Sequence, residues 1–538
     1  MAAVESVSTL RDKLFSSNRT VLLLAAVIFA TSLAVRLYKL DSQTLECDEL
    51  YTVPAVTGHQ YVYLSREGET ASNQIRSSSA DYRQLIKPDK DLGLAAVTSV
   101  LRRNVHLPAY FYFMHYWVEW FGTSAFALRF PAVIFGALAA VALFLLGNEL
   151  FGSLSGVVAA LLMALTPEQI YFSQQARMYS LLALLAICST YFLILLRKRS
   201  QNTWLYFAYA VVSIAGVYTH YEYSFCLAAQ VAFVWLITPM GKENARRWIV
   251  AHAAIGAAFL PWVLITIAQK ANSPEVIAWV NGSLTSNLIL TEVVTKIARL
   301  ISAPELPLGW LSVIVAYALI IYGAVSIRAE RPILLLILLW MIVPIGGIIV
   351  ADKLLGTRAI TITRYWLMAG PPLYLLMSVG LGKIQKQGAR IALAAVLIGF
   401  MFSAALLTAR GELRPKPDRH QEMAVYVDEQ MNAAPDQIVI AEGLNSLPLA
   451  LAYYGNGNFE VLRSKWISDQ LKQRSFTDII GTRAQVLLLV SGQTQMAKLL
   501  NENGFKLEGQ PVLFGHVNVV QFVKRPVSNP NTPSDRPR

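Results

Sequence analysis

The sequence has few charged residues and almost no cysteine. Only 15% of its 538 residues are charged, and 55% are hydrophobic. A soluble domain carries about 25% charged residues. The three cysteines, Cys47, Cys188 and Cys226, have neither the number nor the spacing of a disulfide framework or a zinc site. These deficits exclude an ordinary soluble enzyme and a small disulfide-stabilised domain, and they favour a membrane protein.

The net charge of +12 has a membrane explanation, so no nucleic-acid partner is expected. Basic residues cluster in short segments between long apolar runs, as orientation in a membrane requires. A spanning helix needs about 20 mostly apolar residues, and we identify about eleven such runs. They lie near 20–40, 125–147, 152–170, 177–196, 203–219, 221–239, 248–269, 308–327, 332–351, 365–382 and 390–409. The predicted fold class is therefore an α-helical polytopic membrane protein with about eleven transmembrane helices.

The first apolar run has no small-residue cleavage site, so we interpret it as a retained helix and not as a signal peptide. If the N-terminus is cytoplasmic, nearly every inside segment is basic. The basic residues are Arg11, Lys13, Arg19, Arg197, Lys198, Arg199, Lys242, Arg246, Arg247, Arg328, Arg331, Lys383, Lys386 and Arg390. The odd helix count places the C-terminus outside. With no obvious retention signal, the expected location is a bacterial plasma (inner) membrane.

Three predicted outer segments are too long for simple turns: 41–124, 270–307, and everything after about 410. Within the first, His106–Phe121 is apolar and aromatic but short, which predicts an interfacial or re-entrant helix. The predicted domains are a transmembrane part over 1–410 and a small soluble α/β domain over 411–525, followed by a disordered tail at 526–538.

Two strand-type runs, Gln437–Ala441 and Val486–Val490, indicate the α/β character of the C-terminal part. The stretch Gln495–Asn503 has helical spacing and ends at Gly504, and His516–Val523 is a further strand. Together they predict a small extramembrane domain.

Four carboxylates, Asp41, Glu46, Asp48 and Glu49, lie within nine residues directly after the first apolar run. A carboxylate held at a membrane–water boundary is partly desolvated, and it could act as a general base on an acceptor hydroxyl. A solvated acidic loop is the alternative, and spacing alone favours it.

Two arginines begin apolar runs at the predicted outer side. Arg177 lies in Tyr171–Tyr179, and Arg364 lies in Thr361–Trp366 with Arg358 nearby. Charged side chains at membrane depth are costly and usually paired or functional. A guanidinium offers fixed bidentate donors that suit a phosphate, so the two arginines could hold one phosphate between them. An interfacial arginine that snorkels to water is the alternative.

Two histidines, His106 and His220, also lie at predicted outer helix ends. They could bind a divalent metal with Asp48 or Glu49, although no local ligand spacing of the zinc type is present. A histidine bonded to a neighbour is the more common case. A divalent metal is therefore the one candidate cofactor.

As an ordered series, these motifs resemble the membrane glycosyltransferases of the GT-C superfamily. They are similar to the group of protein O-mannosyltransferases and lipid A aminoarabinose transferases, glycosyltransferase family 39. The series is Arg36-Leu37-Tyr38 with Asp48-Glu49, His106–Tyr110, Tyr171–Tyr179, Thr219-His220-Tyr221 and Arg364-Tyr365. His106–Tyr110 departs at two positions from the family's His-Pro-Pro-Leu-Tyr, and Gln175 replaces its usual Glu. The resemblance covers roughly residues 30–410.

The resemblance implies a polyprenyl-phosphate sugar donor, an active site at the outer face and an acidic catalytic residue in the first outer loop. It assigns Asp48 as the base, with Glu49 assisting or binding a metal. The donor phosphate would be held by Arg177, Tyr179, Arg364 and Tyr365. The expected reaction is transfer of a hexosyl or pentosyl unit to a lipid, protein or polysaccharide acceptor, with inversion at the anomeric carbon.

Two other functions stay open. A transporter or flippase of a lipid-linked sugar would also need buried arginines, but it usually has broken helices in paired halves, and no such pairing is present. A non-catalytic assembly subunit would not need Asp48, Arg177 and Arg364 together.

Overall fold

The structure is a computed structural model. It describes residues 18–59, 77–237, 241–272, 280–413, 419–443, 446–463, 467–468, 470–471, 475–481, 483–491 and 494–524. The predicted tail at 526–538 lies outside these residues. The chain forms two compact units: the first takes the described residues of Met1–Gln43 and Thr98–Pro415, and the second those of Thr44–Val97 and Lys416–Arg538. Residues 44–59 and 77–97 of the predicted outer loop 41–124 thus belong to the second unit.

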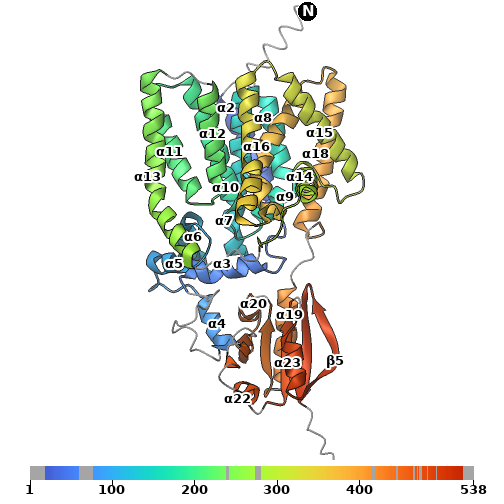
Figure 1. The fold of residues 1–538 in the computed structure, drawn as a ribbon. Helices are drawn as coiled ribbons and strands as arrows, with labels where there is room; N and C mark the ends of the chain where they lie inside the picture. Colours follow the sequence, from blue (N-terminus) through green and yellow to red (C-terminus); the bar gives the residue numbers. More distant parts are fainter. Residues whose placement is uncertain are drawn as a thin grey trace, which may run out of the picture. The chain divides into compact units, whose positions relative to one another are not determined.

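The first unit is built of helices (Figure 1). Every apolar run predicted to span is helical, although the run near 152–170 forms two helices and the run near 365–382 begins as a 3₁₀ helix. The helices are α2 (Asn18–Leu37), α7 (Ala125–Phe151), α8 (Ser153–Leu165), α9 (Pro167–Ser173), α10 (Tyr179–Lys198), α11 (Thr203–Val217), α12 (Tyr223–Ile237), α13 (Lys242–Asn272), α15 (Gly309–Ser326), α16 (Arg331–Leu355), α17 (Gly370–Gly382) and α18 (Gln387–Ala409). The polytopic helical fold class predicted from the sequence is confirmed.

Fewer of these helices than predicted are long enough to cross a membrane on their own. Seven of the described helices pass by length and composition, or eight if α8 and α9, which meet at a bend of 61°, count as one broken span. Helices α11 and α12 are shorter, with 15 residues each. At about 1.5 Å per residue they fall short of a hydrocarbon core of about 30 Å. The apolar runs were located correctly, but their helical lengths were not.

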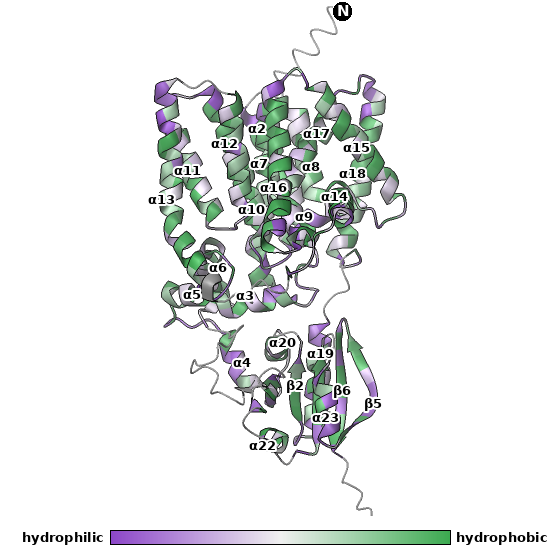
Figure 2. Cartoon of the chain, viewed as in Figure 1, coloured by the Kyte–Doolittle hydropathy of each residue, from purple (hydrophilic) through white to green (hydrophobic). Residues whose placement is uncertain are grey.

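The exposed faces of the spanning helices are apolar (Figure 2). Leu22, Leu264 and Ile314 are among the large hydrophobic side chains that are more than half exposed. A soluble protein rarely exposes so much contiguous apolar surface, and lipid is its natural solvent. At one end of the bundle, Lys198 pairs with Glu149 at 2.7 Å. The predicted basic inside segment after α10 therefore lies beside the turn after α7.

Helices α15 and α17 approach each other closely at glycines. A methyl group added to Gly380 would lie 2.1 Å from the Leu319 carbonyl oxygen, and one added to Gly323 would lie 2.1 Å from the Leu376 carbonyl oxygen. Small residues allow helix backbones to pack in this way inside membranes.

We expect Gly380→Ala to destabilise the protein by about 1–3 kcal/mol, because the added methyl group forces the two backbones apart. The matched control is Gly399→Ala in α18, where an added methyl group meets nothing within 4 Å. Thermal unfolding of the detergent-purified protein measures the difference. Equal melting temperatures for the two variants would contradict the close α15–α17 packing.

Two shorter helices complete the first unit. Helix α6 (Pro108–Phe121) has 14 residues, begins with a proline in its first turn and exposes Trp120 and Phe121. It is not among the spans, in agreement with the prediction of a non-spanning helix. Helix α14 (Ser286–Ile301) was not predicted. It is amphipathic, buries Leu300 and Ile301, and exposes Leu290.

The second unit is an α/β domain around one six-stranded sheet with the order β1-β3-β2-β4-β6-β5. Its strands are β1 (Ser77–Ser78), β2 (Ile438–Glu442), β3 (Glu460–Arg463), β4 (Gln485–Val490), β5 (Phe505–Phe514) and β6 (Val517–Lys524). Strands β3, β2 and β4 are parallel, while β6 and β5 form an antiparallel hairpin. The predicted strands correspond to β2, β4 and β6. The small α/β domain expected from the sequence is confirmed.

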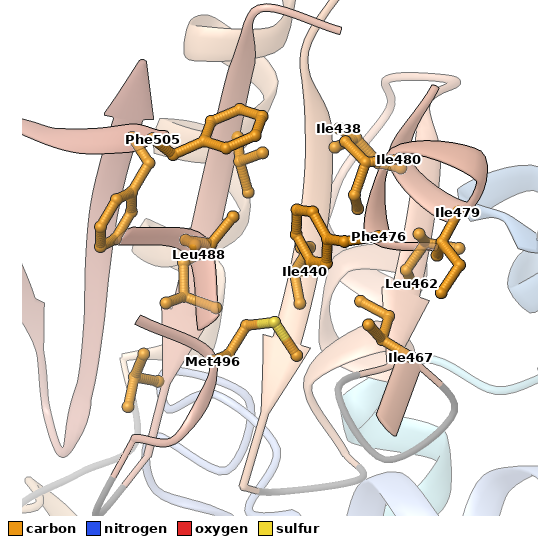
Figure 3. Packing of buried hydrophobic residues seen from close by; sticks show 14 residues of the cluster. Ile438, Ile440, Leu462, Ile467, Phe476, Ile479, Ile480, Leu488, Met496 and Phe505 are labelled. Carbon is orange, nitrogen blue, oxygen red and sulfur yellow. The ribbon is translucent and has the colours of Figure 1, made fainter. Parts of the chain in front are cut away.

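The described helices of this unit are α3 (Cys47–Thr57), α4 (Ser79–Leu85), α5 (Leu94–Leu101, divided between the units), α19 (His420–Ala433), α20 (Leu447–Tyr454), α22 (Phe476–Ile480) and α23 (Met496–Glu502). Of these, α22 and α23 supply residues to the core of the sheet. Ile440 and Leu488 of the central strands pack with Phe476, Met496 and Phe505 in a fully apolar cluster (Figure 3).

The N-terminal segment of the second unit is tied to this domain by main-chain hydrogen bonds. The Leu45 N–H donates to the Tyr454 hydroxyl, and the Leu45 carbonyl accepts from His420 Nδ1 at 3.0 Å. Further along, Ser77 and Ser78 pair with β3 as an edge strand. Residues 44–59 and 77–97 therefore fold with the C-terminal part of the chain.

Candidate active site

Six of the predicted site residues lie in one cluster in the first unit. They are His106, Arg177, Tyr179, His220, Arg364 and Tyr365. They come from separate parts of the sequence: the loop before α6, the break between α9 and α10, the turn between α11 and α12, and the 3₁₀ helix η4 (Thr363–Ala369) before α17. We call this group the arginine cluster.

The first half of the cluster is a hydrogen bond between Arg177 and His106. The Arg177 Nη2 atom lies 3.0 Å from His106 Nε2. A guanidinium can only donate, so His106 Nε2 must accept, and the imidazole is the neutral tautomer with its proton on Nδ1. Arg177 is 3% exposed, which is rare for a charged side chain. The His106 ring also stacks on Phe111 at 5.3 Å.

A break in the helices places Arg177. Helix α9 ends at Ser173, α10 begins at Tyr179, and the chain between them is not helical. Gln174 anchors this break, because its side-chain amide donates to the Arg36 and Tyr38 carbonyls at 2.8 and 3.1 Å. The interruption turns Arg177 out of the helical path and towards His106.

The second half of the cluster surrounds Arg364 with aromatic rings. The Arg364 guanidinium carbon lies 5.9 Å from the Tyr179 ring centre and 5.6 Å from that of Tyr365. The His220 ring lies 5.9 Å from Tyr179 and 5.8 Å from Tyr365. Cation–π contacts of this kind hold a guanidinium by its faces and leave its edge for polar ligands.

Asp352, which the sequence analysis did not single out, organises the chain before Arg364. Its buried carboxylate accepts from the Thr357 hydroxyl at 2.5 Å and from the Ala359 and Ile360 N–H groups at 2.8 Å each. These bonds fix the turn that leads from α16 to η4. Asp352 is therefore a positioning residue for Arg364.

We expect Asp352→Ala to destabilise the protein by about 1–3 kcal/mol, because the turn between α16 and η4 loses the three hydrogen bonds that fix it and leaves buried donors unpaired. The matched control is Lys353→Ala, which alters the exposed neighbour on the same helix and should leave stability unchanged. Thermal unfolding of the purified variants measures the difference. Equal melting temperatures for the two variants would contradict this positioning role.

A third cation lies beside the cluster and was also missed. Lys296 of α14 donates to the Thr363 hydroxyl at 2.8 Å and lies 3.5 Å from Glu292. The spacing of Glu292 and Lys296 suits a helix, but nothing in the sequence connects either residue to Thr363. Lys296 adds positive charge next to Arg364.

Burial and the arginines keep both histidines neutral. Burial lowers the pKa of His220 to about 3, with Arg364 and then Arg177 adding to the effect. Burial likewise lowers the pKa of His106 well below its ordinary value, and Arg177, His220 and Arg364 act in the same direction. The positive charge of the cluster therefore resides on its arginines at physiological pH.

The predicted metal ligands His106 and His220 do not fit a divalent cation. Arg177 already donates to His106 Nε2, and two guanidiniums lie close by. A dication would be repelled by both. Within the part of the chain that the structure describes, no group of three or more His, Cys, Asp or Glu side chains could hold a metal.

The predicted acidic pair lies in the second unit. Asp48 and Glu49 are in the first turn of α3, a position where helices stabilise carboxylates. Glu49 is buried, and its Oε2 accepts from the Glu46 N–H at 2.9 Å, so it holds the start of the helix. Asp48 is half-buried. Arg358, which the sequence analysis noted near Arg364, is exposed and packs over Gly282. It is not a member of the arginine cluster.

One protein-family model matches part of the chain. The family model described as dolichyl-phosphate-mannose-protein mannosyltransferase matches residues 105–266, which include His106, Arg177 and His220. No curated protein matches the chain significantly in sequence.

Solved structures share the fold. ArnT from Cupriavidus metallidurans in the apo state has a TM-score of 0.60 and 12% identity, over 92% of this chain and 97% of that one. The same protein bound to undecaprenyl phosphate has a TM-score of 0.59, with the same identity and coverage. The Archaeoglobus fulgidus oligosaccharyltransferase in complex with Zn and sulfate has a TM-score of 0.51 and 12% identity, over 86% and 67%. The predicted resemblance to membrane glycosyltransferases of the GT-C type is confirmed.

Proposed function

We propose that the protein is a membrane glycosyltransferase that transfers a sugar from a polyprenyl-phosphate donor to an acceptor. The observation that carries this proposal is the arginine cluster, in which Arg177 and Arg364 converge with neutral histidines and tyrosines. The similar fold of ArnT bound to undecaprenyl phosphate supports a lipid-phosphate ligand.

In this proposal Arg177 and Arg364 hold the donor phosphate, and Tyr179 and Tyr365 hold Arg364 in place. A guanidinium pairs with phosphate through fixed, charge-assisted hydrogen bonds. As the anomeric C–O bond breaks, the phosphate takes the electron pair and leaves as an anion. The arginines stabilise this developing charge, so no acid is needed to protonate the leaving group.

The acceptor hydroxyl needs a base, and we assign this role to Asp48. The hydroxyl oxygen attacks the anomeric carbon while its proton passes to the Asp48 carboxylate. Direct attack of this kind inverts the anomeric configuration. Glu49 assists by holding the first turn of α3, where its carboxylate accepts from the Glu46 N–H.

A divalent metal stays a candidate cofactor at Asp48 or Glu49 only, because His106 and His220 are unsuited to one. The oligosaccharyltransferase of similar fold was crystallised with zinc, which supports a test for a metal requirement. Chelation of the purified protein tests it directly, and no step of the proposed reaction passes through a metal.

The same proposal places the acidic loop and the C-terminal domain outside a bacterial plasma membrane, with the N-terminus in the cytoplasm. The acceptor is a lipid, protein or polysaccharide hydroxyl that reaches this face. The rival transporter or flippase would also use buried arginines, but it would release no polyprenyl phosphate. The cluster of donor-holding groups favours a fixed reaction site.

The deciding experiment incubates the purified protein with a panel of polyprenyl-phosphate sugars and a membrane extract as acceptor. Release of free polyprenyl phosphate, dependent on the extract, is the expected result. Movement of intact donor across a vesicle bilayer without release would overturn the enzyme proposal in favour of the transporter.

A further inference from the structure

Glu222 is a buried acidic residue at the edge of the arginine cluster that no predicted role has used. It lies in the turn between α11 and α12, two residues after His220. Its side chain is 8% exposed, and its Oε2 lies 3.8 Å from His220 Nδ1. Neither carboxyl oxygen has a hydrogen-bond partner among the residues that the structure describes.

The neighbouring histidine does not satisfy this carboxyl group. His220 Nδ1 faces the Glu222 backbone N–H at 3.3 Å, and because that N–H donates, Nδ1 accepts. The nitrogen therefore has no proton to offer the carboxyl group. Burying a carboxyl group without hydrogen bonds is costly, so such a group in a folded protein needs an explanation.

Burial also disfavours the ionised form of this group. It raises the pKa of Glu222 well above its ordinary value, and the opposing effect of Arg364 is the smaller one. A neutral carboxylic acid has one O–H donor and further acceptor capacity. A ligand that supplies both a donor and an acceptor would satisfy it, as a sugar hydroxyl does.

We propose that the Glu222 carboxyl group binds hydroxyl groups on the sugar of the lipid-phosphate donor, which makes it a specificity-determining residue. This inference rests on the proposed function. The phosphate of the donor does not explain a carboxyl group here. An ionised carboxyl group would repel it, and a neutral one would keep an unmet acceptor, because the phosphate oxygens of the donor only accept hydrogen bonds. Arg364, whose charge acts on Glu222, is one of the residues that we assign to the phosphate. The group next to that phosphate in the donor is the sugar.

A counter-charge for Arg364 is the simpler explanation of Glu222. It requires an ion pair, yet the Glu222 carboxyl group makes no hydrogen bond to Arg364 or to any other described residue, and the imidazole 3.8 Å from it, that of His220, is neutral. The two explanations differ in which part of the donor they affect. Sugar recognition affects the glycosylated lipid alone, whereas a counter-charge affects every lipid phosphate.

The test compares two ligands on the full-length protein in nanodiscs. One is undecaprenyl phosphate, and the other is the best binder among polyprenyl-phosphate mannose, glucose, galactose and arabinose. We expect Glu222→Leu to lower affinity for the glycosylated lipid about tenfold, the loss of two neutral hydrogen bonds. Affinity for undecaprenyl phosphate should stay unchanged. Glu222→Gln keeps a donor and an acceptor and should stay within about threefold of the native protein.

Two further variants distinguish loss of sugar binding from a general loss of folding. Glu222→Asp keeps the carboxyl group but withdraws it by one methylene, and it should weaken glycosylated-lipid binding several-fold in a folded protein. Tyr221→Phe, at the neighbouring position, removes the hydroxyl that contacts Thr266 at 2.9 Å and should change neither affinity.

The outcomes separate the two levels of the proposal. If Glu222→Leu and Glu222→Asp shift both ligands equally, or leave the glycosylated lipid unaffected, the sugar-binding role is overturned while the transferase proposal survives. If the native protein binds no glycosylated lipid more tightly than undecaprenyl phosphate, and releases no polyprenyl phosphate from any of these lipids, the proposed function itself fails.

Discussion

Asp48→Asn should reduce turnover by about 10²–10⁴ while donor binding is retained, because general-base help of this size is lost with the proton acceptor. Asparagine keeps the shape and much of the hydrogen bonding of aspartate. The donor phosphate is assigned to Arg177 and Arg364, so the carboxylate is not needed to hold it. The measurement pairs single-turnover release of polyprenyl phosphate with binding of undecaprenyl phosphate to the purified protein.

The controls for this prediction come from the same acidic segment. Asp41→Asn alters an exposed carboxylate a few residues earlier and should leave turnover near the native rate. Glu49→Gln weakens the start of α3 and should do less harm than Asp48→Asn. If Glu49 binds an essential metal, its loss is as severe and chelation stops the native protein. A native rate for Asp48→Asn would refute the mechanism.

The second large effect concerns the two arginines. We expect Arg177→Ala and Arg364→Ala each to weaken donor binding tenfold to a hundredfold, since a hydrogen bond to a charged group contributes about 1.5–3 kcal/mol. Lysine should not restore binding at either position, because it lacks the planar fork that meets a phosphate through two bonds. Titration with undecaprenyl phosphate measures both effects.

Arg358→Ala is the matched control for this pair. Arg358 precedes Arg364 by six residues but is exposed and packs over Gly282. The Arg358→Ala protein should bind undecaprenyl phosphate with the native affinity. Arg177→Ala carries an added cost in stability, because His106 Nε2 loses its donor, so melting temperatures accompany the titration. Native affinity in both folded alanine variants would remove the arginines from the site.

Much of the membrane fold could be predicted because hydrophobic length is a strong signal. All the apolar runs proved helical, including α2, α10 and α16. The signal is weaker where a run is broken: α8 and α9 share one apolar stretch, but Thr166-Pro167 ends the first helix and a bend of 61° follows. In the C-terminal domain, β5 was missed because its residues are mostly exposed and Glu508, Gly509 and Gln510 interrupt its apolar pattern.

Some residues of the candidate site could also be predicted from the sequence, and others could not. His106, Arg177, His220 and Arg364 are unusual at helix ends and could be identified from residue type and position. Their convergence could not, because it depends on packing between helices far apart in sequence. Glu222 lacked any such signal: an acid beside a histidine is common, and only its burial without a hydrogen-bond partner makes it distinctive. Lys296 and Asp352 act through contacts that no spacing encodes.

The hydrogen bonds of Leu45 make the C-terminal part of the chain responsible for fixing the segment that leads to Asp48 and Glu49. Leu45 is completely buried three residues before Asp48, and its two main-chain groups are held by Tyr454 and His420. Hydrogen exchange at the Leu45 amide should therefore become faster when the C-terminal domain is destabilised and slower when it is stabilised. A shortened chain that ends before the C-terminal domain would still carry Asp48, but it would lack the two side chains that immobilise the peptide leading to it.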